Sequence, residues 1–480
     1  MKPLASVIIP VLNEDQNLLK CLSAVFGQEV DFNFEVLVVD SGSTDRTREL
    51  AQEFAQKQPL RLLEVKREEF SHGRTRQFAS EQAQGEYLIY LVADAVPADN
   101  QWLKKLVDSA RNDDKIAGVY SRQLPRPGAE LLEKIRLKRR KVSSAEPSET
   151  EIKKAEDYWL MTPLLRIGFC DFDDVSSLRK KSALDKIPIR DCAWAEDLVW
   201  SRDCLLKGFK IVYQPESMVY HSHPGKAFYF FRRGWLDQKS AGKYFGQVYY
   251  PALPDAVRGF FYSIQEMLRD AGNEEAEFFE KLSAIFQAPI ISAFEIAGRY
   301  LAGLKQESEA GYDLVRNFSR ATILPANARE RVTRTAFTIG DGWKKVILAN
   351  PAAIINYQVQ VREDSELRFG IGIKPEAFRN RSAPIDFMVA LDQEPIFKTR
   401  LEMTLENLQG WKEFALPLKQ WAGKEVKLSL VTASEDIKSG WAGWAEPKIV
   451  FKDKKPGRSL KKYLAGWAEQ RAGSSGFRHP

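Results

Sequence analysis

The chain has 480 residues, of which 44% are hydrophobic and 28% are charged, and its formal net charge is +6. This composition is that of a globular protein, and the length predicts two to four domains. So small a net charge on so long a chain argues against a nucleic-acid partner, because such binding needs basic residues gathered on one face. The four cysteines form no C-x-x-C pair. They argue against a zinc ribbon or a disulfide scaffold and favour a reducing compartment.

We expect no signal peptide and no membrane-spanning segment. Residues 1–10 lack the apolar core and cleavage site of a signal peptide. The most apolar stretch, residues 284–297, contains Gln287, Pro289 and Glu295 and is shorter than the ~20 residues that a spanning helix needs. The expected protein is soluble or peripheral, and cytoplasmic.

Residues 4 to about 120 alternate between strand and helix patterns. Three β-branched apolar runs are typical of buried parallel strands: residues 6–10, 34–40 and 87–92. Two stretches between them have helical periodicity: residues 14–26 and 44–58. Ser43 and Thr44 are the predicted caps of the second helix. This alternation predicts a doubly wound α/β sheet, which binds ligands beyond the carboxyl ends of its strands.

The rest of the chain changes character twice. Residues 130–154 are highly charged and predict a helix followed by a mobile loop, and residues 255–320 are helical in pattern. Short alternating strands between residues 333 and 452 predict a β-sandwich. The predicted domains are an α/β domain (1–245), a helical extension (246–330), a jelly-roll-like β-sandwich (331–453) and a basic flexible tail (454–480).

Polar residues follow the first two predicted strands, in the segments PVLNE (10–14) and DSGSTD (40–45). An acid at a strand end can bind a base or a ribose, and small residues after it let the backbone approach a ligand. Each signal is weak alone, because an aspartate after a strand is often a turn or cap residue. The two together favour a nucleotide site.

The motifs VIIPVLNE, VVDSGSTDRT, FSHGRTRQFA, LVADAVP, AEDL and VYHSH, in this order, resemble family 2 glycosyltransferases, the inverting enzymes of the GT-A fold. The resemblance covers residues 4–240, half of the chain. The F-x-H-G-x-T-R element and the D-A-x-P ending are most similar to the rhamnosyltransferase-like branch. The resemblance implies an α/β GT-A domain that transfers a sugar from a nucleotide-diphospho-sugar with inversion.

The resemblance also implies a donor-binding set. The loop after the first strand and Asp40 would hold the uracil or thymine base and its ribose. Arg76 would lie near the diphosphate, because a planar guanidinium matches phosphate oxygens; the alternative is a solvated helix residue. The implied set is Pro10, Val11, Leu12, Asn13, Glu14, Asp40, Ser41, Gly73, Arg76, Ala93 and Asp94.

The family's D-x-D element, which holds Mg²⁺ or Mn²⁺ against the diphosphate, is reduced here to Ala93-Asp94-Ala95. The resemblance implies that Asp94 binds the cation together with His221, with His223 as a second choice. An imidazole ligand suits Mn²⁺ more readily than Mg²⁺. The alternative is that both histidines face solvent at a strand end.

Asp197 in WAEDLVW matches the family's catalytic base, and Glu196 beside it would support it or bind the acceptor. Inverting transfer needs a carboxylate that takes the proton of the acceptor hydroxyl. The alternative is that both acids simply open a helix, because acids favour a helix N-terminus. Ser177 and Arg179 match the family's acceptor segment, and Trp194 either stacks on a sugar ring or belongs to the core.

Two further segments allow weaker expectations. Trp411, Trp421 and the motif GWAGWAEP (440–447) resemble carbohydrate-binding-like jelly-roll domains, although most of these tryptophans are expected in the core. The basic run at 134–141 and the amphipathic residues 256–268 predict contact with anionic lipid. The alternatives are a partner-docking sandwich and a solvated helix.

Taken together, the sequence and the resemblance predict an inverting glycosyltransferase that depends on Mn²⁺ or Mg²⁺. The expected donor is dTDP-rhamnose, and the expected acceptor is a polysaccharide or a lipid-linked glycan. Two alternatives stay open. One is a UDP-hexose or GDP-mannose transferase of the same fold, and the other is a glycan-binding protein whose GT-A domain has lost turnover.

Overall fold

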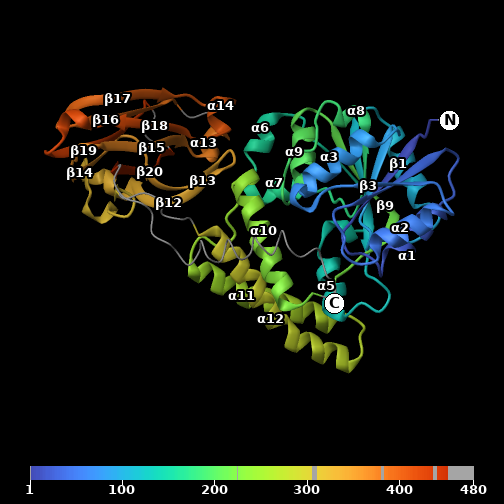
Figure 1. Ribbon diagram of the computed structural model, residues 1–480. Helices are drawn as coiled ribbons and strands as arrows, with labels where there is room; N and C mark the ends of the chain where they lie inside the picture. Colours follow the sequence, from blue (N-terminus) through green and yellow to red (C-terminus); the bar gives the residue numbers. More distant parts are fainter. Residues whose placement is uncertain (1, 224, 305–310, 380–382, 436–440, 452–480) are drawn as a thin grey trace.

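A computed structural model describes residues 2–223, 225–304, 311–379, 383–435 and 441–451 of the chain. Figure 1 shows an α/β domain (blue to green) beside a β-sandwich (orange to red), with long helices running below both. The predicted basic tail, residues 454–480, lies outside the described residues. Within the described ranges, no helix combines the length and the apolar character that crossing a bilayer requires.

The α/β domain is built on one mixed sheet. Its strands are β1 (Ala5–Val11), β2 (Phe34–Asp40), β3 (Leu60–Glu64), β4 (Tyr87–Leu91), β5 (Val96–Pro97), β6 (Ile116–Leu124), β7 (Ser148–Glu151), β8 (Ser176–Lys180) and β9 (Lys210–Tyr220). The strand order is β3-β2-β1-β4-β8-β6-β9-β5, and β7 pairs with β9. Strands β1 to β4 pair in parallel, whereas β8 runs antiparallel to β4 and β6. The register places Val11 opposite Asp40, so the carboxyl ends of β1 and β2 meet at one edge.

Helices cover both faces of this sheet, which explains why strands β1, β2 and β4 are largely apolar. Val7 and Ile9 of β1 belong to one core cluster, and Ile8 belongs to the other. The main helices are α1 (Leu18–Phe26), α2 (Thr47–Ala55), α3 (His72–Gln82), α4 (Trp102–Arg111) and α9 (Glu196–Leu206). Shorter helices of this domain are α6 (Ala155–Trp159), α7 (Pro163–Phe169) and α8 (Lys181–Leu184). Two other short helices, α13 (Pro375–Arg379) and α14 (Leu405–Leu408), lie between strands of the sandwich.

Two local predictions in this domain are wrong. Helix α2 begins at Thr47 after the N-cap residue Arg46, so Ser43 and Thr44 do not cap it. The Ser43 hydroxyl instead accepts a hydrogen bond from the Asn13 backbone N–H, because the loops after β1 and β2 bind each other. The predicted mobile loop after residue 138 contains strand β7, which pairs with β9.

The helical layer consists of α10 (Ala227–Phe245), α11 (Leu253–Asn273) and α12 (Phe278–Gly303), with α5 (Leu131–Lys138) packed against the last two. Helices α10 and α12 approach each other closely at two glycines. A Cβ on Gly234 would lie 2.3 Å from the Glu295 carbonyl oxygen, and one on Gly298 would lie 2.1 Å from that of Phe231. Any side chain at these positions would therefore force the helices apart.

The basic run at 134–141 binds carboxylates of the protein. Arg136 lies 2.8 Å from Glu295 of α12, and Arg139 lies 2.7 Å from Asp270 of α11. The predicted contact of this run with anionic lipid stays a prediction, and these ion pairs do not favour it. Helices α11 and α12 also expose large apolar side chains: Leu253, Val257, Phe261, Tyr262, Phe278, Phe279, Ile285, Phe286, Ile290 and Phe294.

The carboxyl-terminal part is a sandwich of two antiparallel sheets. Its strands are β10 (Gly311–Asp313), β11 (Thr322–Leu324), β12 (Val332–Ile339), β13 (Gly342–Ala349), β14 (Ala353–Gln360), β15 (Ser365–Ile373), β16 (Ile385–Leu391), β17 (Glu394–Leu401), β18 (Lys412–Pro417), β19 (Glu425–Ala433) and β20 (Ala442–Phe451). One sheet has the order β12-β13-β20-β15-β18, with β10 beside β20, and the other has the order β11-β14-β19-β16-β17. Because β10 and β11 pair with sandwich strands, the sandwich begins earlier than the predicted residue 331.

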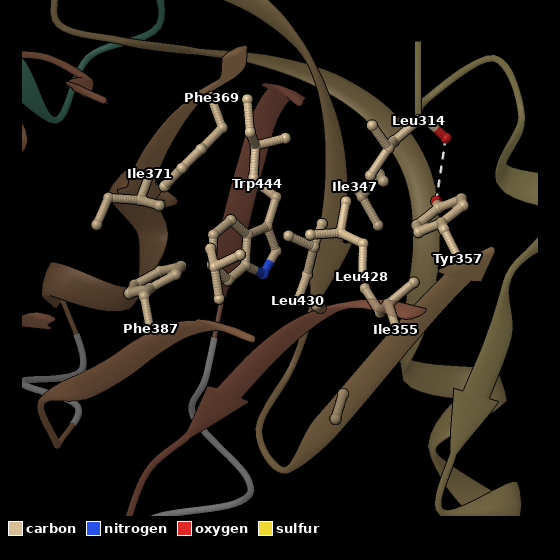
Figure 2. Packing of buried hydrophobic residues seen from close by; sticks show 14 of the residues in the cluster. Leu314, Ile347, Ile355, Tyr357, Phe369, Ile371, Phe387, Leu428, Leu430 and Trp444 are labelled. Carbon is tan, nitrogen blue, oxygen red and sulfur yellow. Dashed lines mark hydrogen bonds between the residues drawn. The ribbon is translucent and has the colours of Figure 1, made fainter. Parts of the chain in front are cut away.

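Figure 2 shows the core between these sheets, with Trp444 at its centre. The Trp444 ring is fully buried, 5.2 Å from the Phe387 ring of the facing sheet. Trp421 is also buried, and Trp343, Trp411 and Trp441 are half-buried. Trp421 and Trp444 are therefore core residues, and sugar binding by the sandwich stays a prediction.

Candidate active site

The ends of β1, β2, β4 and β9 open on a cleft with a volume of ≈ 430 Å³. Helices α9 and α10 form its opposite wall. Most predicted site residues line this cleft: Pro10, Val11, Leu12, Glu14, Ser41, Arg76, Ala93, Asp94, Trp194, Glu196, Asp197 and His221. Five other predicted residues do not line it: Asn13, Asp40, Gly73, Ser177 and Arg179.

Asp40 and Asn13 shape the loops at the cleft edge. The buried Asp40 carboxylate accepts hydrogen bonds from the backbone N–H groups of Gly42 and Ser43, at 3.1 and 3.2 Å. Gly42 has φ = +85°, a conformation that glycine adopts without strain. The Asn13 side-chain oxygen accepts from the Thr44 backbone N–H at 2.8 Å. Contact of Asp40 with a base or ribose therefore stays a prediction.

Asp94, His221 and His223 form a cluster in which one ligand atom of each lies within 4.8 Å of the others. The pairing of Val96 in β5 with Tyr220 in β9 brings these two chain segments together. His221 Nε2 and His223 Nδ1 each lie 3.7 Å from the same oxygen of Asp94. The structure thus places His223 as close to Asp94 as His221.

This donor set fits a divalent cation. His221 Nδ1 lies 3.0 Å from the Gln123 side-chain oxygen, which orients the ring and leaves Nε2 on the side of Asp94. Burial lowers the pKa of His221, so its imidazole is neutral near pH 7, the form that binds metals. The cluster also carries a protein cation, because Arg126 lies 3.2 Å from the Asp94 carboxylate.

Arg76 lies in a buried cluster of charges on the opposite side of the cleft. Its guanidinium is 3.1 Å from Asp174 and 2.8 Å from Glu196, and its side chain is 7% exposed. Two carboxylates pair with Arg76, which gives it a structural role, and its contact with a diphosphate stays a prediction. Arg76 connects the start of α9 with the segment before β8.

Asp197 begins helix α9 together with Glu196, as the sequence predicts. The preceding residue, Ala195, has φ = +64°, which is uncommon for a residue other than glycine. One Asp197 oxygen accepts from the Leu198 backbone N–H at 2.8 Å, and the other lies 3.4 Å from the Asp174 backbone nitrogen. Burial and the neighbouring carboxylates, first among them Glu196, raise the pKa of Asp197 well above its ordinary value.

Ser177, Arg179 and Gly73 have structural positions that do not fit direct ligand contact. Arg179 is fully buried and donates to Asp174 at 2.9 Å, and the Ser177 hydroxyl donates to the same carboxylate at 2.6 Å. A Cβ on Gly73 would lie 1.9 Å from the Arg190 carbonyl oxygen, so glycine is required there by packing. All three residues therefore stabilise the structure around the cleft and do not line it.

Residues 6–161 match the sequence profile described as Glycosyl transferase family 2. These residues are therefore similar to glycosyltransferases of this family. The mixed α/β sheet of the amino-terminal domain has the GT-A fold. The match covers strands β1 to β7 of the α/β domain and does not extend to β8, α9, β9 or the sandwich.

Several known proteins are similar to this glycosyltransferase domain. Glycosyltransferase AglE of Haloferax volcanii is 36% identical over 129 residues, 26% of this chain and 42% of AglE. The O-antigen chain rhamnosyltransferase RfbN of Salmonella typhimurium is 27% identical over 223 residues, 45% of this chain and 66% of RfbN. The chain thus spans less than two thirds of the length of each. The mannosyltransferase PcManGT of Pyrobaculum calidifontis, solved with GDP-Man and Mn²⁺, is 19% identical with a TM-score of 0.41, covering 62% of this chain and 86% of PcManGT.

Two arginines of the glycosyltransferase cleft carry no motif, and the sequence analysis missed them. Arg67 follows β3 and Arg232 lies on α10, and both line the cleft. Burial lowers the pKa of both guanidiniums, and the charge of Arg67 lowers the pKa of Arg232 further. An arginine guanidinium is suited to bind phosphate oxygens. Only the fold brings these positions together, so no local pattern could have identified them.

Trp194 forms part of the wall next to the carboxylates. Its indole N–H donates to Asp237 at 3.0 Å, and the Arg233 guanidinium lies 5.2 Å from its ring centre. His72 meets the same ring edge-on at 5.7 Å. Trp194 is thus held in place and lines the cleft, and its stacking on a sugar stays a prediction.

Proposed function

We propose that the chain is an inverting glycosyltransferase that moves a sugar from a nucleotide-diphospho-sugar to a hydroxyl of a glycan. One observation carries this proposal. A single cleft holds both a carboxylate with two imidazoles and a buried carboxylate of raised pKa. The first group suits a cation beside a diphosphate, and the second suits a general base.

Each protein group has a definite task in this proposal. Asp197 accepts the proton of the acceptor hydroxyl while the hydroxyl oxygen bonds to the anomeric carbon. The bond between that carbon and the diphosphate oxygen breaks on the opposite face, and the nucleoside diphosphate leaves. Arg67 and Arg232 stabilise the charge that develops on it. Glu196 fixes the start of α9 through Arg76.

Asp94, His221 and His223 are the residues that would hold the divalent cation. The cation, when bound, would neutralise charge on the leaving diphosphate. Two imidazole nitrogens suit Mn²⁺ better than Mg²⁺, which prefers oxygen ligands. We therefore propose Mn²⁺ as the better cofactor.

The proposed donor is dTDP-rhamnose. Its support is the F-x-H-G-x-T-R element together with the similarity to two O-antigen chain rhamnosyltransferases, RfbN and WbaN. A polysaccharide or a lipid-linked glycan is the proposed acceptor. We also propose a cytoplasmic location, which the four buried free cysteines support because thiols persist in a reducing compartment.

The test is sugar transfer from dTDP-rhamnose, UDP-hexoses and GDP-mannose to glycan acceptors, with the anomeric configuration of the product read by NMR. Wild type should invert the configuration with one donor. Asp197→Asn should lose about 10²–10⁴-fold in kcat, the usual contribution of a general base. Asp185→Asn, at an exposed position after α8, is the matched control and should keep full activity. Retention of configuration, or full activity of Asp197→Asn, would contradict the proposal.

A further inference from the structure

One contact of the sandwich with the glycosyltransferase domain is made by the tip of its β12–β13 hairpin, and another is made by Arg379, which donates to the Leu160 carbonyl oxygen. The Asp341 carboxylate at this tip lies 3.3 Å from Arg166 and 3.1 Å from Arg202. Both arginines belong to the glycosyltransferase domain, and their side chains are 2% and 8% exposed. Arg166 also donates to the Gly340 carbonyl oxygen at 2.5 Å. One carboxylate of the sandwich thus pairs with two buried cations of the other domain.

The backbone on both sides is shaped for this contact. The Thr338 hydroxyl donates to the Gly246 carbonyl oxygen at 2.8 Å. Gly246 has φ = +65°, and a Cβ there would lie 2.5 Å from the Thr338 methyl group. Gly340 has φ = +57°, and a Cβ there would lie 1.7 Å from the Gln409 carbonyl oxygen. Glycine at position 246 is therefore required by the close approach of the hairpin, whereas glycine at position 340 is required by packing within the sandwich.

The contact joins three helices that build the cleft. Arg166 lies on α7 and Arg202 on α9, and both donate to carbonyl oxygens at the end of α10, those of Phe245 and Tyr244. The same helices line the cleft through Ile167, Asp197 and Phe245. The ion pairs of Asp341 thus lie on helices whose other residues face the substrate space.

We propose that Asp341 is a positioning residue that holds α7, α9 and α10 together, so that Asp197 at the start of α9 faces the acceptor. The sandwich then stabilises the arrangement of these three helices, which line the cleft. This inference rests on the proposed function, because Asp197 acts there as the base.

Electrostatic repulsion between the two arginines is the reason that Asp341 is needed to hold these helices together. Without the Asp341 charge, Arg166 would lose this carboxylate partner, and Arg202 would keep Asp203 at 3.3 Å. The repulsion between the two guanidiniums would then be less compensated and would tend to separate α7 from α9. Burial and the charge of Arg202 already lower the pKa of Arg166, and Asp341 opposes this. The nucleotide side of the cleft, on β1, β2 and β9, makes no contact with the hairpin in these ion pairs. Loss of Asp341 should therefore affect the chemical step and leave donor binding intact.

The experiment uses the full chain and compares Asp341→Asn, Asp341→Glu and Asp386→Asn. Asp386 pairs with Arg400 within the sandwich, so its variant controls for loss of an ion pair elsewhere. Three quantities are measured: kcat for transfer, the Kd for dTDP or UDP with Mn²⁺, and the acid limb of the pH–rate profile. A misplacement of about 1 Å costs up to a hundredfold in rate.

We expect Asp341→Asn to lower kcat by about a hundredfold and to change the Kd by less than about twofold. Asp341→Glu should recover most of kcat, because it restores the charge, and Asp386→Asn should match wild type. Thr338→Val keeps every charge and serves if Asp341→Asn does not fold; it should lower kcat with an unchanged Kd. An unchanged kcat in the folded Asp341→Asn or Thr338→Val variant would overturn the inference, as would a parallel loss of kcat and nucleotide affinity. An inactive wild type would instead refute the proposed function.

Discussion

Replacing Arg76 with methionine separates the two roles that this residue could have. Methionine keeps much of the apolar length of the arginine side chain and removes its charge. In the structure, the Arg76 guanidinium lies 3.1 Å from Asp174 and 2.8 Å from Glu196, and all three side chains are at most 7% exposed. The substitution therefore leaves two buried carboxylates without this partner.

The expected loss in the free energy of unfolding follows from the ion pairs that each carboxylate keeps. Asp174 keeps Arg179 at 2.9 Å, whereas Glu196 loses the ion pair that connects it to α3. Removing one partner of a buried ion pair costs about 3–5 kcal/mol. Because one of the two carboxylates stays paired, we expect a loss at the lower end of this range, about 3 kcal/mol of unfolding free energy. For a domain of this size, that lowers the thermal midpoint by roughly 6–12 °C.

The assay is thermal unfolding of the full chain, followed by circular dichroism, together with the Kd for dTDP or UDP with Mn²⁺. Arg46→Met is the matched control, because Arg46 and its partner Glu49 are 63% and 57% exposed. Exposed pairs contribute little, so the control should unfold like wild type. An Arg76→Met variant as stable as the control, but with weakened nucleotide binding, would refute the structural role and support diphosphate contact.

Three further predictions concern the base, the metal cluster and the sandwich core. Asp197 must be deprotonated to act as the base and its pKa is raised, so kcat should fall as the pH decreases through a midpoint above the ordinary aspartate pKa of 3.8; an acid limb at or below that value would contradict the assignment. His221→Ala should abolish the Mn²⁺ dependence of dTDP binding measured by calorimetry, whereas unchanged dependence would exclude His221 as a ligand. Trp444→Ala should destabilise the sandwich by about 3–5 kcal/mol in urea unfolding, because it empties a fully buried position; a loss below about 1 kcal/mol would contradict that packing.

The elements of the glycosyltransferase domain could be predicted because their signals are local. The run FEVLVVD predicts residues 34–40, and strand β2 has those bounds. The helical spacing of EDLVWSRDCLLKG likewise predicts α9 with Asp197 in its first turn. The first residues of the sandwich were assigned to the helical extension, because β10 and β11 have three residues each and carry no periodic pattern.

The candidate site could be predicted only where family motifs mark it. Asp94 and His221 follow strand ends far apart in the chain, and the family resemblance implied that they bind one cation. The ion pair of Arg76 with Asp174 could not be predicted, because Asp174 is distant from Arg76 in the chain and only the fold brings them together. The ligand contacts of Arg76 and Arg179 stay predictions. The ion pairs of Asp341 with the other domain could not be predicted either. The segment Gly340-Asp341-Gly342 has the pattern of an ordinary hairpin turn, and nothing in it indicates a partner.

The central claim is that this cleft binds a nucleotide-diphospho-sugar through a metal-dependent site and activates it. The most direct measurement is release of nucleoside diphosphate from a panel of dTDP-, UDP- and GDP-sugars with Mn²⁺, for wild type and Asp94→Ala. We predict slow release from one donor by wild type, since water can replace the acceptor, and none by Asp94→Ala. Absence of release from every donor, together with nucleotide binding that does not depend on Mn²⁺, would contradict the claim.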